Sequence, residues 1–171
     1  LGLTYESLGQ LEQAKTCAVE AMEQIRSQPG TEAEVASSQN NLATICLRQD
    51  RLEEAETWIA RAMPYYESAA ARQDPHLANA YATLAAIRCR QDRLAEALTA
   101  YDKAAEEMER FFGRNLNTAS LWFNGALTAG GLHRPDAMER LCRAEALYRQ
   151  LQGPDGPMAR RAEEVRRQWE D

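Results

Sequence analysis

Arg-Gln-Asp-Arg-Leu occupies residues 48–52 and occurs again, unchanged, at residues 90–94, a shift of 42. When residues 36–62 are laid over residues 78–104 at this shift, thirteen of the twenty-seven positions are identical. Self-similarity at a period of about 20–50 residues indicates an architecture of stacked structural repeats. The sequence therefore predicts a repeat protein, and the content of one unit decides the fold.

Each unit has the pattern of two amphipathic helices. Leu42, Ile45 and Cys46 in its first half follow the i, i+3, i+4 spacing of one helical face, and Leu52 and Ala55 begin the same pattern in its second half. Small side chains are needed where helix axes lie about 8–10 Å apart. We therefore expect the recurring alanines to be contact points between helices: Ala43, Ala55 and Ala62, then Ala85, Ala97 and Ala104.

These alanine positions resemble the tetratricopeptide repeat, whose usual period is about 34 residues. The longer period of 42 here resembles the kinesin-light-chain type of tetratricopeptide array. The resemblance implies an all-α fold, a right-handed α-solenoid of antiparallel helix pairs with a C-terminal capping helix. It also implies a concave groove, lined by the first helix of each pair, that binds proteins or peptides.

The chain is predicted to form a single domain, residues 1–171. Its repeats are expected at about residues 1–30, 31–73, 74–115 and 116–155, followed by a closing helix at 157–170. Leu1, Gly2 and Tyr5 fall where the middle of a first helix belongs, with Gly9 and Gln10 in the turn after it. We therefore expect this sequence to be a piece of a longer protein.

Capping residues and helix breakers predict where several helices begin and end. Thr31 with Glu34 has the pattern of a capping box, and Asp74 followed by Pro75 is typical of an N-cap and first helical residue. Thr118 is expected to begin the first helix of the fourth unit. Gly113 is expected to end the helix before it.

Two further breakers fall in the second helix of one unit and in the last turn between helices. Pro64 lies inside a helix expected from Arg51 to about Arg72, where a proline costs about 3 kcal/mol. We expect a kink or a break there, either tolerated near the helix end or serving as a hinge. In the fourth unit, the turn between the first and the second helix is expected to span residues 130–135.

Composition and charge exclude several functional classes. The net charge of −6 and a pI near 5.1 argue against nucleic-acid binding, and no apolar run is long enough to predict a membrane span. The four cysteines have neither pairing nor zinc-ligand spacing, which favours free thiols in the reducing cytoplasm. His76 and His133 are expected on the surface. We predict no enzyme, no metal and no cofactor.

The candidate binding residues form a polar stripe on the first helices. Spacings of three and four place the members within each unit on one helical face. Such side chains can hydrogen-bond an extended peptide backbone, or can simply form a solvated face; for the arginines, which lie beside a turn, we favour the solvated face. The stripe consists of Ser37, Asn41, Thr44 and Arg48, then Asn79, Thr83 and Arg90, then Asn124.

The carboxylate clamp of chaperone-binding tetratricopeptide domains is not expected here. Asn41 matches the asparagine of that clamp. Asn79 and Thr83, however, take the places of its lysine and arginine.

The sequence thus predicts a non-enzymatic scaffold for a protein or peptide ligand, which would be acidic if the arginines contact it. Two alternatives stay open: a peptide- or effector-sensing domain of a larger signalling protein, and a module that forms a homo-oligomer through a repeat end.

Overall fold

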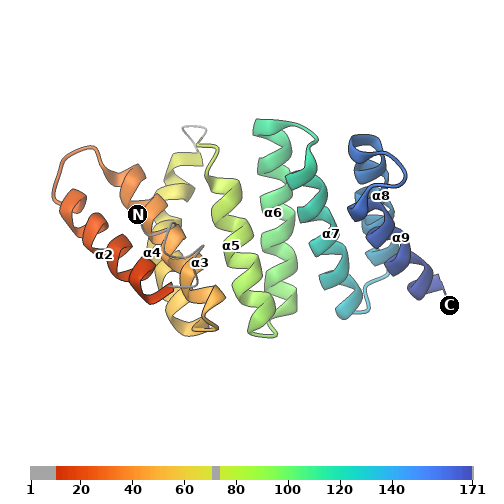
Figure 1. The fold of residues 1–171 in the computed structure, drawn as a ribbon, viewed down its shortest axis with the longest axis horizontal. Helices are drawn as coiled ribbons and strands as arrows, with labels where there is room; N and C mark the ends of the chain where they lie inside the picture. Colours follow the sequence, from red (N-terminus) through yellow and green to blue (C-terminus); the bar gives the residue numbers. More distant parts are fainter. Residues whose placement is uncertain (1–10, 71–73, 171) are drawn as a thin grey trace.

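The computed structural model describes residues 11–70 and 74–170, and in these ranges the chain forms α-helices and no strand (Figure 1). The helices are α2 (Leu11–Arg26), α3 (Glu32–Arg48), α4 (Leu52–Ala70), α5 (Leu77–Arg90), α6 (Leu94–Phe112), α7 (Leu116–Gly131), α8 (Ala137–Gln152) and α9 (Pro157–Glu170).

The helices are stacked in chain order along the long axis of the molecule, from α2 at one end to α9 at the other (Figure 1). Each helix packs against its neighbour in sequence, and α3 also contacts α5. The pairs α3–α4, α5–α6 and α7–α8 each form an antiparallel hairpin. The predicted all-α solenoid of helix pairs is therefore confirmed.

Alanines at three recurring places let these helices approach closely. All of them are buried, eight completely and one with 7 % of its surface exposed. The predicted contact points are therefore confirmed, and the fourth unit has them too. They are Ala43, Ala85 and Ala126 on the first helices, Ala55, Ala97 and Ala137 early in the second helices, and Ala62, Ala104 and Ala144 further along.

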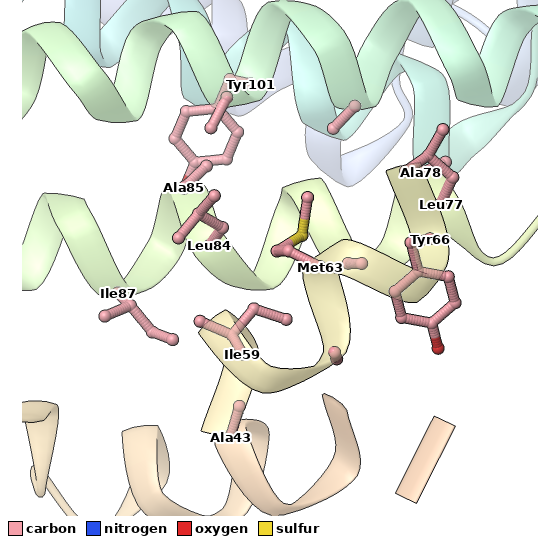
Figure 2. Packing of buried hydrophobic residues seen from close by; sticks show 14 of the residues in the cluster. Ala43, Ile59, Met63, Tyr66, Leu77, Ala78, Leu84, Ala85, Ile87 and Tyr101 are labelled. Atoms are coloured by element: carbon pink, nitrogen blue, oxygen red, sulfur yellow. The ribbon is translucent and has the colours of Figure 1, made fainter. Parts of the chain in front are cut away.

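Large apolar side chains fill the space between the alanines. Figure 2 shows Ile59 of α4 between Ala43 of α3 and Ile87 of α5, all three of which are buried. Because one second helix contacts two first helices in this way, each unit shares its core with the next. A repeat solenoid is stabilised largely by such contacts between neighbours.

The repeated pentapeptide forms the turn between paired helices. Asp50 and Asp92 have left-handed backbones, with φ of 61° and 58°. In each turn the following N–H reaches back to a carbonyl of the last helical turn, from Arg51 to Cys46 and from Arg93 to Arg88, both at 2.9 Å. This is the Schellman arrangement, in which aspartate tolerates the left-handed conformation better than most residues.

The turn between α7 and α8 begins later than the sequence predicts. The helix continues through Gly130 and Gly131, and His133 (φ 52°) takes the left-handed place. Gly130 is required for packing rather than for the turn, because a Cβ there would lie 2.7 Å from the ring of Trp169 in α9.

The predicted capping box at Thr31 is wrong. Thr31 makes no cap with its side chain. Its hydroxyl instead donates to the carbonyl oxygens of Ile25 and Gln28, both at 2.8 Å, at the end of α2. The hydroxyl therefore satisfies carbonyl groups at the end of the preceding helix and is not available to cap the following one.

The predicted start at Asp74 and Pro75 is wrong by two residues. Asp74 accepts hydrogen bonds from the backbone N–H of His76 at 2.8 Å and contacts its ring Nδ1 at 3.0 Å. These bonds close a turn, and the helix begins at Leu77.

The first helix of the fourth unit, α7, also begins two residues away from its predicted start, at Leu116 instead of Thr118. Asn115 is the N-cap and accepts from the N–H groups of Asn117 and Thr118. Thr118 is buried and donates to the carbonyl of Gly113 at 2.9 Å. Gly113 (φ 68°) ends α6 as predicted.

Pro64 does not break α4, which contains it as an interior residue. Pro64 lies on the exposed side, as does Ala60, whose carbonyl would have accepted the missing N–H. Met63 and Tyr66 on either side are buried. Apolar packing therefore holds the helix together across the proline.

The remaining sequence predictions concern the first unit, the cysteines and the histidines. Leu1, Gly2, Tyr5, residues 9–10 and Arg72 lie outside the described residues. Cys46 is buried as predicted, but Cys89 is only half-buried. His76 and His133 are exposed.

Candidate functional site

The polar stripe lies on the side of the first helices that the core leaves uncovered. On α3 the apolar neighbours Leu42 and Ile45 are buried, whereas Asn41 and Thr44 are half-buried and Arg48 is exposed. We call the predicted set the first-helix face. It comprises Ser37, Asn41, Thr44 and Arg48 of α3, Asn79, Thr83 and Arg90 of α5, and Asn124 of α7.

Three asparagines of the first-helix face have unused side-chain amides. Asn79 and Asn124 are exposed and Asn41 is half-buried. None of the three amides has a hydrogen-bond partner among residues 11–70 and 74–170. Each amide offers two donors and one acceptor oxygen, so each can bind a peptide group in either direction.

The hydroxyl groups of the face are partly engaged in the fold. Thr44 donates to the carbonyl of Asn40 at 3.1 Å and Thr83 to that of Asn79 at 3.0 Å. Both oxygens can still accept. Ser37 hydrogen-bonds with Tyr66 of α4, and burial is the main reason that the pKa of Tyr66 rises to about 12.

Arg90 is held by the preceding unit. Its Nη2 donates to Oδ1 of Asp50 at 2.7 Å, which joins the end of α5 to the turn between α3 and α4. An acidic ligand at Arg90 would have to compete with Asp50.

Sequence reasoning missed a second surface, a hollow of about 500 Å³ whose walls are the second helices α6 and α8. Helix α7 comes between these two helices in the row (Figure 1). We call this hollow the α6–α8 groove. It is lined by Asp102, Ala105, Glu106 and Glu109 of α6, Trp122 of α7, and Asp136, Glu139, Arg140 and Arg143 at the start of α8.

Arg140 crosses the groove and joins its two walls. It donates to both carboxylate oxygens of Asp102, and its Nε donates to Asp136 at 2.7 Å. Hydrogen bonds from Arg134 and Arg140 hold the pKa of Asp136 well below its usual range. Asp102 and Asp136 are therefore neutralised by Arg140 and Arg134 together.

The floor of the groove is an aromatic ring that already carries cations. The guanidinium of Arg143 lies 3.5 Å from the ring centroid of half-buried Trp122, and that of Arg114 lies at 5.5 Å. Both arginines also pair with Glu109, at 3.3 and 3.8 Å. An indole face and a carboxylate thus bind guanidinium groups together here.

Two carboxylates of the groove are not used by the fold. Glu106 on α6 and Glu139 on α8 are exposed, and no cation within the described ranges pairs with either. The sequence signal was Asp102, Glu106 and Glu109 at i, i+4 and i+7, which marks one face of a helix.

The corresponding hollow between α2 and α4, of about 250 Å³, has the opposite charge. Its charged lining consists of Arg26, Arg61 and Glu32, and Gln39 stands where the groove has Trp122. The guanidinium of Arg61 lies over Trp58 of its own helix instead, at 4.8 Å. The hollow between α2 and α4 is lined by an aromatic residue too, Tyr65, so it is the acidity and the stacking of guanidinium groups on Trp122 that distinguish the α6–α8 groove from it.

Neither a metal cluster nor a membrane helix is found in the part of the chain that the structure describes. No group of three or more His, Cys, Asp or Glu residues there could hold a metal ion. No helix there is long and apolar enough to span a bilayer.

Comparison with known proteins gives a family and a number of similar solved structures, two of which are named here. Residues 1–68 match the family model described as Tetratricopeptide repeat. No curated protein matches the chain. BtubC (BKLC) from P. vanneervenii has a TM-score of 0.69 at 19 % identity, over 89 % of this chain and 62 % of that one.

This chain thus spans less than two thirds of BtubC, and at that identity the likeness concerns the fold alone. The TPR2AB-domain:pHSP90-complex of yeast Sti1 is 12 % identical over 99 % of this chain and 83 % of that one. Its TM-score of 0.44 is too low to carry an argument.

Proposed function

We propose that this chain, whose residues 1–68 match the tetratricopeptide-repeat family, is a non-enzymatic scaffold that binds a protein or peptide segment along the first-helix face. The observation that carries the proposal is the set of unpartnered amides of Asn41, Asn79 and Asn124. They come from three consecutive first helices, α3, α5 and α7. An extended segment that runs across these helices would meet one amide on each.

The asparagines are better candidates than the arginines of the same face. A neutral hydrogen bond contributes about 0.5–1.5 kcal/mol, and one to a charged group about 1.5–3. Arg90, however, already makes its charged bond with Asp50. A ligand gains the amide bonds at no cost to the fold, and gains the arginine bond only by breaking an existing one. We therefore propose that backbone recognition by the amides contributes most of the affinity.

The test uses a phage library of random peptides selected against the wild-type protein. The variant replaces Asn41, Asn79 and Asn124 by Ala, which favours helix slightly and should not lower stability. Loss of about 0.5–1.5 kcal/mol at each position predicts binding weakened roughly tenfold or more, with an unchanged melting temperature.

The matched control replaces Gln24, Gln150 and Gln168, three exposed amides on other helices, by Ala. It should bind the selected peptides as the wild type does. If the selected peptides bind the asparagine variant as tightly as the wild type, the first-helix face is not the binding site.

A further inference from the structure

We propose that the α6–α8 groove is a second binding surface, which takes an arginine-bearing segment of a partner polypeptide. This surface is built from second helices and from Trp122, and it shares no residue with the first-helix face. The two surfaces can therefore be tested independently.

Charge is the first argument for a basic guest. Five acidic side chains line the groove against two basic ones, and Arg114 and Arg134 pair with two of the acids from its edge. Arg140 is taken up by Asp102 and Asp136. Glu106 and Glu139 are thus left as unpaired carboxylates, one on each wall. A cation between the walls would be approached by carboxylates from two helices, and it would relieve the excess negative charge of the lining.

The groove's own arginines supply the second argument. Arg143 lies over the Trp122 ring at 3.5 Å and pairs with Glu109 at 3.3 Å. A planar guanidinium suits both partners, because it stacks on aromatic faces and presents a fork of N–H groups to a carboxylate. Arginine is therefore a better guest than lysine for the remaining carboxylates.

Size and contrast supply the third argument. A hollow of about 500 Å³ is within the range of about 300–1,000 Å³ that is usual for ligand pockets. The smaller hollow between α2 and α4 carries two arginines and one glutamate in its lining. An arginine-bearing segment would therefore distinguish the two hollows, and should bind only the one between α6 and α8.

The experiment measures fluorescence anisotropy of a fluorescein-labelled peptide of alternating arginine and glycine. Its reference is the same peptide with citrulline, a neutral analogue of similar shape, in place of every arginine. We expect the arginine peptide to bind more tightly, and its affinity to fall with added salt because the carboxylates are exposed. Equal binding of the two peptides would overturn the proposal.

Two charge-neutralising variants locate the site. Glu106→Gln with Glu139→Gln should weaken binding by roughly fivefold, the order expected for two exposed ion pairs. Glu20→Gln with Glu164→Gln removes the same charge from exposed sites on α2 and α9, and should change little. If both pairs of substitutions weaken binding equally, the attraction is due to net charge and not to the groove.

A third variant should increase the affinity. Arg143→Gln removes a positive charge that competes with the guest for Trp122 and Glu109. We expect severalfold tighter binding of the arginine peptide. An unchanged or lower affinity would contradict a guest cation in this groove, whatever the first-helix face binds.

Discussion

The doubled region at residues 36–104 and the C-terminal region at residues 116–170 have the same architecture, but different side chains hold it together. In the doubled region the turn residues Asp50 and Asp92 lie in identical pentapeptides. In the C-terminal region His133 takes that backbone place after two glycines, and Trp169 of α9 packs over Gly130.

This difference separates what the fold requires from what one unit happens to use. The alanines at Ala55, Ala97 and Ala137 are buried in all three units. The residues in the turns and the aromatic residues, by contrast, differ from one of these units to the next. The positions of small side chains therefore determine the architecture, and the other residues adapt to it. Each of the following experiments changes one region and uses the other as its reference.

The largest effect is expected from deletion of α9, residues 157–171. Ala159 and Ala162 are fully buried against the apolar cluster of α7 and α8, which includes Phe123 and Leu147. Their loss should expose that cluster and cost at least about 3 kcal/mol. Amide hydrogen exchange should show protection lost in α7 and α8 but retained in α4 and α5. Unchanged protection in α7 would mean that α9 does not stabilise this region.

The next largest effect is expected from Ala97→Leu, because the site is completely buried. Overpacking typically costs about 1–3 kcal/mol, which urea unfolding would measure. Ala137→Leu, at the equivalent site of the C-terminal region, should cost less because 7 % of that residue is exposed.

The control for these two leucine substitutions is Ala95, which is exposed on the same helix as Ala97. The neighbouring residue Glu96 would be a poorer control, because its replacement would also remove an ion pair with Arg93 at 2.7 Å. Ala95→Leu should leave stability nearly unchanged. If it is as costly as Ala97→Leu, the assignment of the buried face is wrong.

Smaller effects are expected at two adjacent glycines, where the same substitution should stabilise at one position and destabilise at the other. Alanine in place of a helical glycine normally stabilises by about 0.5–1 kcal/mol. Gly131→Ala should show much of that gain, because its new Cβ would meet only Leu94 Cδ1, at 3.3 Å, and this methyl group at the end of a flexible side chain can shift slightly to make room. Gly130→Ala should instead destabilise by about 1 kcal/mol, because the ring of Trp169 must move. Thermal unfolding with near-ultraviolet circular dichroism would test both, and a gain at Gly130 would contradict the packing of α9.

The smallest effect is expected from removal of one hydroxyl in each region. Tyr148 donates to Ser120 at 3.0 Å, and Tyr66 bonds with Ser37 at the equivalent place. Tyr148→Phe and Tyr66→Phe should each cost about 0.5 kcal/mol in chemical unfolding, the low end of the range for a neutral hydrogen bond, because each serine partner is only half-buried. A much larger loss at one site would show that the two hydroxyl bonds are not equivalent.

Most of the fold could be predicted from the sequence, because periodicity and small residues report burial directly. The helix pairs and the buried alanines follow from them. Helix ends were less predictable, because one polar side chain can serve either of two helices. Thr31 bonds back to α2, and Asp74 closes a turn with His76. Pro64 does not break its helix because packing outweighs the lost hydrogen bond.

The candidate surfaces could be predicted only in part. Helical phase placed Asn41 and Thr83 at the surface, but it could not show that Asp50 would bind Arg90. The α6–α8 groove needed the third dimension, since its walls come from two helices about a whole repeat apart in the sequence. Only in the structure do Glu106 and Glu139 line one hollow.

The ion pairs that join consecutive units have a mechanical consequence. Arg90 binds Asp50, and Arg143 binds Glu109, each across more than thirty residues of sequence. These side chains are between 34 % and 69 % exposed, so dissolved ions screen the pairs on a length of about 8 Å at physiological ionic strength. The apolar contacts between units are not screened in this way. Added salt should therefore lower the bending stiffness of the molecule while its melting temperature stays nearly constant.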